Sequence, residues 1–399
     1  MPLDLAEASL LLTFFNALTE GSTYALIAVG YTMVYGIVKL INFAHGEVYM
    51  VGAVTAWWLF VTPQVPLLAA LLLAMAVCAA LGLALDRVAY RPLRRSTRLA
   101  ALITAIGMSL VLQTTVQLTF GAKFEAFPET TRARVLVDGC PARERPDPAA
   151  REVVTLGLGS QPPVARHAGP SPAGWVPVAW TVDPRAPGPD GPSPEGPPGE
   201  GADDASTSAV LWVEAAHVRR LQGTPPALNA DVLAGAGGER LKLPLKDVLI
   251  WVAAAGMMLG LHLLVQRTKV GRAMRACALD QTTAALMGVS VDRVIAYTFM
   301  IGSAMAAVAG VLYSLKVGGN ISFRMGYYPG VIAFAAAVLG GIGNLKGALL
   351  GGMLLGFTKA FCATYLSSDY DFAACFSVMI GVIIFRPYGL LGRPGATRA

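Results

Sequence analysis

Charged residues are scarce in this chain. They make up 14% of its 399 residues, while 55% are apolar; soluble domains average roughly 25% charged residues. The mean hydropathy is correspondingly high, at +0.56. This composition excludes an intrinsically disordered protein, an ordinary soluble enzyme and a nucleic-acid binder built on basic patches, so we expect no nucleic acid among its partners. The net charge of +6 is typical of a membrane protein with basic cytoplasmic loops.

Cysteines, histidines and catalytic motifs are also few. The five cysteines include no C-x-x-C pair, and the four histidines form no cluster with metal-ligand spacing. The sequence has no G-x-S-x-G, no H-E-x-x-H and no phosphate-binding G-x-x-x-x-G-K-[ST]. We therefore expect no catalytic residue, no metal and no cofactor bound by this chain, and we predict that it is not an enzyme.

Proline and charge are concentrated in one internal block, residues 123–246. The block holds 19 of the 26 prolines and is net −2, whereas the remainder is net +8. Such a composition buries too little apolar surface to offset its ordering entropy, most clearly at 187–201. We predict a largely disordered extracytoplasmic insertion; the alternative is a small accessory fold. The block separates two parts of a transmembrane domain, 1–122 and 247–399.

Long apolar runs fill the rest of the chain. A membrane-spanning helix needs about 20 mostly apolar residues, and nine segments qualify: 22–38, two helices within 48–85, 99–120, 248–266, 294–315, 325–345, 347–366 and 372–385. Residues 8–19 are an open case, either a tenth span, a re-entrant piece or an interfacial helix. Pro329 and its neighbouring glycines indicate a broken or re-entrant segment. We predict an all-α polytopic membrane protein with about nine (eight to ten) transmembrane helices.

Basic loops give the predicted orientation, because Lys and Arg gather on the cytoplasmic side of short loops. Loops 86–98 and 267–293 carry five Lys or Arg each. Two predicted spans separate these loops, so both can be cytoplasmic. The C-terminus and residues 39–47 then also lie inside, while Glu20 and the insertion lie outside.

The sequence N-F-A-H-G-E at 42–47 joins two predicted spans on the inner side. Its polar residues Asn42, His45 and Glu47 have two interpretations. They either cap a helix and satisfy the loop backbone, or they form part of a gate or pathway. His45 and Glu47 alone are too few to make a metal site.

Loop 267–293 contains a predicted amphipathic helix that begins near Gly271 and continues to a glycine stop at Gly288. Arg272 and Arg275 lie one turn apart and can face a partner together. The helix either lies on anionic lipid or docks a cytoplasmic partner, and the composition does not separate these readings.

Lys359 is a single charge well inside the predicted span 347–366. A lone ammonium at the centre of a lipid-facing helix costs about 2.5–3.5 kcal/mol. Lys359 is therefore predicted to face the protein interior, a partner subunit or a water-filled cavity, or to reach towards Asp369 at the outer interface. We favour interfacial pairing over a direct role in the transport pathway.

Residues 21–53, GSTYALIAVGYTMVYGIVKLINFAHGEVYMVGA, resemble the N-terminal signature of the integral-membrane permease subunit of branched-chain amino acid ABC importers. Segments 86–110, 270–309 and 336–352 are similar to later parts of the same family. The resemblance implies the ABC importer permease fold in a bacterial inner membrane. It also implies a permease for leucine, isoleucine and valine that forms part of the translocation pathway.

The resemblance further implies partners: a second related permease, two cytoplasmic ATPase subunits that bind ATP, and an extracytoplasmic substrate-binding protein. The segment coupled to the ATPase would include Gly271, Arg272, Arg275, Ala284 and Gly288. The family commonly has a short loop in place of the insertion and an acidic residue in place of the intramembrane lysine.

Two alternatives to this function stay open. Related permeases move urea, short amides or other amino acids. A secondary transporter is the competing class, and it would need buried acids for ion coupling; the predicted spans offer only Lys359 and His262 as ionisable groups well inside them.

Overall fold

The computed structural model describes residues 5–40, 42–94, 96–122, 244–317 and 321–392, together with six strands between residues 132 and 221. The chain divides into two compact units. One is helical and comprises Met1–Phe60, Val65–Phe127 and Ala227–Ala399; the other comprises Val61–Gln64 and Pro128–Pro226.

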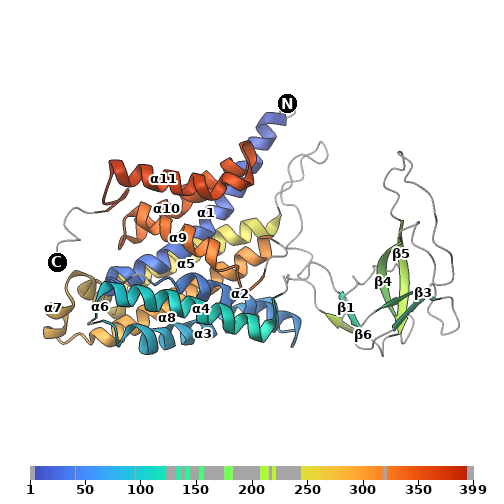
Figure 1. Ribbon diagram of the computed structural model, residues 1–399, viewed down its shortest axis with the longest axis horizontal. Helices are drawn as coiled ribbons and strands as arrows, with labels where there is room; N and C mark the ends of the chain where they lie inside the picture. Colours follow the sequence, from blue (N-terminus) through green and yellow to red (C-terminus); the bar gives the residue numbers. More distant parts are fainter. Residues whose placement is uncertain are drawn as a thin grey trace. The chain divides into compact units, whose positions relative to one another are not determined.

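The helical unit is built from apolar helices (Figure 1). In chain order they are α1 (Leu5–Val38), α2 (His45–Val61), α3 (Leu67–Leu85) with the π-helical turn η1 (Asp86–Tyr90), α4 (Arg98–Phe120), α5 (Leu245–Arg267), α6 (Lys269–Leu279), α7 (Gln281–Leu286), α8 (Val291–Val317), α9 (Tyr327–Gly340), α10 (Leu345–Tyr365), η4 (Ser368–Tyr370) and α11 (Asp371–Phe385).

Seven of these helices, among the described residues, are long and apolar enough to cross a membrane. The helices α2 and α9 are shorter, with 17 and 14 residues. The predicted all-α polytopic fold with some broken segments is confirmed. The centre of the unit is formed by α1 and α8, whose spanning windows are 89% and 72% buried, against 22% for α3, α4 and α5. The outer faces of α3, α4 and α5 are left for lipid or for partner subunits.

The first helix corrects one expectation. α1 is a continuous helix of 34 residues, so residues 8–19 form neither a tenth span nor a separate interfacial piece. Its first turns pack along α10, where the Phe14 ring lies 5.3 Å from that of Phe357. Glu20 interrupts the apolar run in the sequence and was assigned to an outer loop, but it lies within this helix.

Small residues allow α1 and α10 to approach each other closely. A Cβ added at Gly356 would overlap the backbone of Gly21, and one added at Gly352 would overlap Ala25. Close backbone approach of this kind is a main source of helix association in lipid. Gly352 and Gly356 therefore set the spacing between α1 and α10.

The two basic loops meet at one end of the helical unit, as the sequence predicted. Arg94 bridges Asp86 and Asp292, with 2.5 Å to each carboxylate. On the neighbouring helices, the Gln281 side-chain amide donates to the Ile37 carbonyl at 2.5 Å. We refer to this end, where α1 stops and η1, α6 and α7 lie, as the basic end.

The smaller unit contains β-strands: β1 (Arg132–Val135), β2 (Cys140–Arg143), β3 (Glu152–Leu156), β4 (Trp175–Val182), β5 (Thr207–Glu214) and β6 (Val218–Leu221). A four-stranded sheet has the order β3-β2-β5-β4, and β1 pairs with β6. All pairs are antiparallel, and the longest runs from Trp175 opposite Glu214 to Val182 opposite Thr207. Strands thus form within the predicted insertion. The Pro/Gly-rich tract at 187–201 lies outside the described residues, and the disorder of that tract stays a prediction.

Gly356→Ala is expected to destabilise the helical unit, because a methyl group at this position has no room beside Gly21. Overpacking of this kind costs about 1–3 kcal/mol. Gly107→Ala on α4 is the matched control, since nothing lies within 4 Å of a Cβ there. Thermal unfolding of the purified variants in detergent measures the difference. Equal Tm values for the two variants would contradict the close crossing of α1 and α10.

Replacing residues 128–226 with a short Gly/Ser linker is expected to leave the helical unit inserted and folded, because the two units have separate cores. Membrane fractionation and the Tm of the purified protein check this outcome. Loss of inserted protein in the deletion variant would show that the smaller unit is needed for folding.

Candidate functional site

The two short helices α2 and α9 both begin inside the bundle, and their first turns lie next to each other. A Cβ at Gly46, in the first turn of α2, would lie 2.9 Å from the Gly330 Cα and 2.7 Å from the Gly326 carbonyl oxygen of the α9 start. Only glycine permits this contact. We call this place, with Tyr31, His45, Gly46, Glu47, Gly326 and Gly330, the α2–α9 junction.

The junction lies deep in the bundle. The His45 side chain rests against Gly30, where an added Cβ would be 2.5 Å from the imidazole Nε2. Gly30 precedes the last residue of α1 by eight residues, or about 12 Å of helix. The chain therefore re-enters the bundle between α1 and α2, although 39–47 was predicted only to join two spans on the inner side.

Glu47 is almost fully buried at the junction, with 2% exposure. Its Oε1 accepts hydrogen bonds from the Gln113 side-chain amide at 2.7 Å and from the Ser109 hydroxyl at 3.1 Å, both on α4. Its Oε2 has no hydrogen-bond partner and lies against Gly326. One carboxylate oxygen is thus anchored and the other is free in the interior.

His45 is the second buried polar group, with 1% exposure. Its ring meets the Tyr31 ring at 4.6 Å in an edge-to-face arrangement. The imidazole is also bonded to the backbone of Ile27, while Nε2 has no partner. The sequence motif 42–47 therefore places two incompletely bonded polar groups in the centre of the protein.

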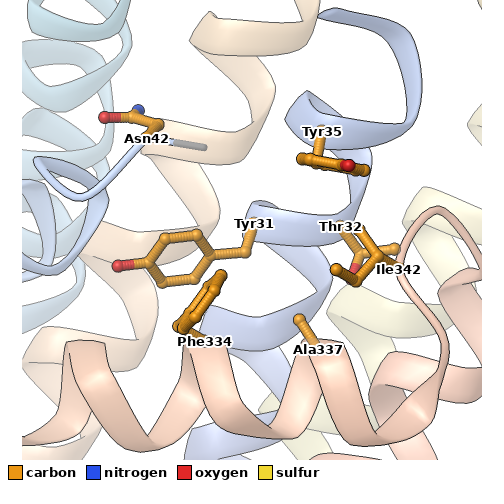
Figure 2. Close-up of a pocket in the computed structure, with 7 residues that line it drawn as sticks. All are labelled: Tyr31, Thr32, Tyr35, Asn42, Phe334, Ala337 and Ile342. Atoms are coloured by element: carbon orange, nitrogen blue, oxygen red, sulfur yellow. The ribbon is translucent and has the colours of Figure 1, made fainter. Parts of the chain in front are cut away.

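A narrow cavity adjoins the junction (Figure 2). It is lined by Tyr31, Thr32, Tyr35, Asn42, Phe334, Ala337 and Ile342. Figure 2 shows the Tyr31 ring above that of Phe334, and the two ring centres are 6.1 Å apart. The cavity volume is about 10 Å³, roughly the room that one water molecule needs. The cavity is closed to an amino acid in this conformation.

Asn42 does not cap α2 with its side chain, which corrects one of the two interpretations. Its Oδ1 accepts a hydrogen bond from the Tyr90 hydroxyl at 2.7 Å, and its carbonyl accepts from the His45 amide at 3.1 Å. Asn42 therefore fixes the re-entrant segment to η1 at the basic end.

Lys359 lies apart from the junction and has partners that the sequence did not reveal. Its ammonium is 3.1 Å from Glu20 and 3.0 Å from the Tyr24 hydroxyl, both on α1. Asp371 is 3.9 Å away and takes the place predicted for Asp369. Lys359 faces the protein interior, and Glu20 is also 3.9 Å from Lys316 on α8.

The predicted coupling residues are only partly arranged as expected. Gly271 packs against the last turn of α5, where a Cβ would overlap the carbonyl of Val265. The Arg275 guanidinium donates to that same carbonyl, one of those that a helix end leaves unpaired. Arg272 is exposed. Arg275 thus fastens α6 to α5, and the contact of both arginines with a partner stays a prediction.

The next turns give α7 a defined start and end. Asp280 caps α7, and hydrogen bonds from the Thr283 hydroxyl and the Thr282 amide hold the pKa of Asp280 below its ordinary value. Ala284 is buried. Gly288 follows the helix with φ +83° and is exposed, which fits the predicted glycine stop.

Three large apolar side chains protrude from this segment. Leu279, Leu286 and Met287 are 90%, 83% and 80% exposed. They were not among the residues predicted to couple to a partner, which were mainly glycines and arginines. Their position in a charged loop between two apolar spans is the signal that could have found them. Exposed apolar residues rimmed by polar ones mark interaction sites.

The α6–α7 segment is fastened to the same helix that lines the junction. Gln281 bonds the Ile37 carbonyl at the end of α1, and Arg275 bonds the end of α5. A second cavity is lined by residues of α1, α5, α6 and the start of α10. Thr32 lines both cavities. The α6–α7 segment is therefore in direct contact with α1.

These features define a class of protein. The apolar helices, the buried polar junction between interrupted helices and the protruding α6–α7 segment together describe a multi-pass membrane permease. The family model for the permease component of branched-chain amino acid transport systems matches residues 13–134 and 206–386, and the chain belongs to this family. The unmatched residues 135–205 lie within the predicted insertion.

Individual relatives agree with this family. The high-affinity branched-chain amino acid transport system permease protein LivH of Escherichia coli is 34% identical over 388 residues, with 95% of this chain and 94% of LivH covered. BraD of Pseudomonas aeruginosa is 36% identical over 387 residues, at the same coverage. The ribose import permease RbsC of Haemophilus influenzae is 24% identical over 40% of this chain and 50% of RbsC. No solved structure matches the chain significantly.

The charge that Lys359 brings into the bundle is expected to be compensated by Glu20 (3.1 Å). Lys359→Met should lower stability, because it leaves a buried carboxylate with only the more distant Lys316. The double variant Glu20→Gln/Lys359→Met should regain part of the loss, with a coupling energy of about 0.5–3 kcal/mol.

Thermal unfolding of the wild type, both single variants and the double variant gives this coupling energy. Lys346→Met is the control, since Lys346 is exposed on the same helix and should have no effect. Strictly additive losses in the double variant would show that Glu20 and Lys359 do not interact energetically.

Proposed function

We propose that this chain is the permease subunit of an ATP-binding-cassette importer that moves leucine, isoleucine and valine into a bacterial cell. The observation that carries this proposal is the 34–36% identity across 95% of the chain to LivH and BraD, both permease proteins of high-affinity branched-chain amino acid systems. The protein binds no cofactor itself, and ATP is hydrolysed on partner subunits.

A second, related permease completes the membrane part of the importer. Support comes from one organism, Methanocaldococcus jannaschii, which has two relatives of this chain. Its probable LivH permease is 29% identical over 149 residues and its probable LivM permease is 29% identical over 204 residues. The outer faces of α3, α4 and α5, which the helical unit leaves exposed, are available to such a partner and to lipid.

The α6–α7 segment docks on a cytoplasmic ATPase subunit, with the basic end towards the cytoplasm. Leu279, Leu286 and Met287 supply the apolar contact and Arg272 supplies charge. Closure of the ATPase pair on ATP pushes this segment, and the bonds from Gln281 and Arg275 carry the movement to α1 and α5. The extracytoplasmic binding protein delivers the substrate at the opposite end.

The proposal is tested with the complete importer in proteoliposomes. ATP-dependent uptake of radiolabelled leucine is expected, with isoleucine and valine as competitors. Uptake of ribose, urea or a short amide with no uptake of leucine would replace the substrate class. Uptake driven by an ion gradient without ATP would replace the importer class by a secondary transporter.

The double variant Leu286→Asp/Met287→Asp is expected to reduce uptake about tenfold or more at unchanged Tm. Both side chains are exposed, so the chain itself loses no packing, whereas an apolar contact that loses its centre costs about 2 kcal/mol or more. Ser96→Asp is the control, because Ser96 is exposed in the other loop of the basic end and the change adds a charge there without removing an apolar side chain.

Uptake and ATP hydrolysis are measured together in the reconstituted complex. Normal uptake by the double variant would remove the docking assignment. Gly288→Leu, which forces a side chain into positive φ, and the pair Arg272→Glu/Arg275→Glu are expected to uncouple hydrolysis from uptake as well. As a single change, Arg275→Glu should also lower the Tm, because Arg275 fastens α6 to α5. Arg272→Glu alone should leave the Tm unchanged.

A further inference from the structure

One feature of the α2–α9 junction points to a ligand. The Oε2 of Glu47 is buried, unpartnered and placed against Gly326, the residue that precedes α9. The start of α9 is not a site of its own, because Pro329 has no N–H and the N–H groups of Tyr327 and Gly330 bond the carbonyls of Arg324 and Gly326.

A buried carboxylate oxygen without a partner is costly, because it has lost its hydration. The anchoring of Oε1 by Gln113 and Ser109 keeps the carboxylate in place. Among the described residues no Lys or Arg forms an ion pair with Glu47. A donor from outside the chain could complete this site, and an ammonium group is the best match for a carboxylate.

An aromatic wall lies directly beside this position. Tyr31 reaches the junction, since its hydroxyl is 3.6 Å from where a Cβ of Gly330 would lie. Phe334 follows one turn further along α9, and its ring is 6.1 Å from that of Tyr31 and 5.3 Å from that of Phe43. A polar group at one side and an apolar wall at the other is the usual composition of a small-molecule site.

We propose that the α2–α9 junction holds the amino acid during its passage through the permease. Glu47 Oε2 accepts hydrogen bonds from the substrate ammonium. The aliphatic side chain lies against Tyr31, Phe43 and Phe334. This inference rests on the proposed function and adds the substrate contacts within the membrane.

The present conformation is the closed form of this site. The adjoining cavity has room for about one water molecule, so α9 and α1 must separate before an amino acid enters. Gln281 fixes the end of α1 to the α6–α7 segment, which gives the ATPase a direct means to bring about this separation.

The test uses the complete importer in proteoliposomes and photo-leucine, a diazirine analogue of leucine. Illumination followed by peptide mass spectrometry is expected to label α1, the 39–44 segment or α9 near Tyr31, Phe43 and Phe334, and excess leucine should abolish the label. Labelled permease peptides that all lie elsewhere would overturn the proposal. Failure of the wild-type importer to take up leucine at all would instead contradict the proposed function.

Glu47→Gln keeps the shape of the side chain and removes its charge. Leucine uptake is expected to fall about tenfold or more, the loss of one hydrogen bond to a charged group, together with the photo-leucine label. Asp247→Asn is the matched control, because Asp247 is also a buried acid with an unpartnered oxygen but lies at the start of α5, at the opposite end.

Normal uptake and labelling in Glu47→Gln, in a complex with wild-type Tm, would overturn the proposal. An equal loss of uptake in Asp247→Asn would also overturn it, because the effect would then follow from any buried acid. If Glu47→Gln does not assemble, the position of the wild-type label decides the matter alone.

Discussion

The contact between Gly46 and Gly330 determines how the interior of this permease is built. Because neither residue has a side chain, the first turns of α2 and α9 meet backbone to backbone in the middle of the bundle. Interrupted helices are tolerated at membrane depth only where protein covers their open ends, and here each helix start covers the other. The polar residues that follow, His45 and Glu47, are thereby carried into the core rather than left at a surface loop.

This geometry connects chemistry at the centre with mechanics at one end. α1 contributes Tyr31 to the junction and ends at the carbonyl that Gln281 holds. The α6–α7 segment therefore reaches the junction through one rigid helix instead of through a series of loops. Asn42 adds a second tether, from the re-entrant segment to Tyr90 in η1. The basic end is thus bonded both to α1 and to the segment that leads into α2.

The sequence predicted the features that depend on local composition. Apolar runs identified the long helices, and the basic loops identified one shared end of the bundle. Prediction from the sequence failed where residues far apart in the chain determine the structure. Glu20 interrupts an apolar run and was assigned to a loop, because nothing nearby in the sequence shows that Lys359 will neutralise it.

The same limit applied to the candidate site. The motif 42–47 was recognised, but its anchors Ser109 and Gln113 were not, although two polar residues four apart in the run 99–120 were a usable signal. Arg275 was assigned to a partner surface from its spacing to Arg272. Its bond to Val265 depends on how α6 packs on α5, and the composition of the chain does not show that packing.

The pairing of Glu20 with Lys359 also has a consequence for the biogenesis of the protein. The two residues are separated by 339 positions, and the chain is made from its N-terminus. The first helix is therefore made before both of its cationic partners, Lys316 on α8 and Lys359 on α10. The charge of Glu20 is thus compensated only after the C-terminal part of the chain has been made.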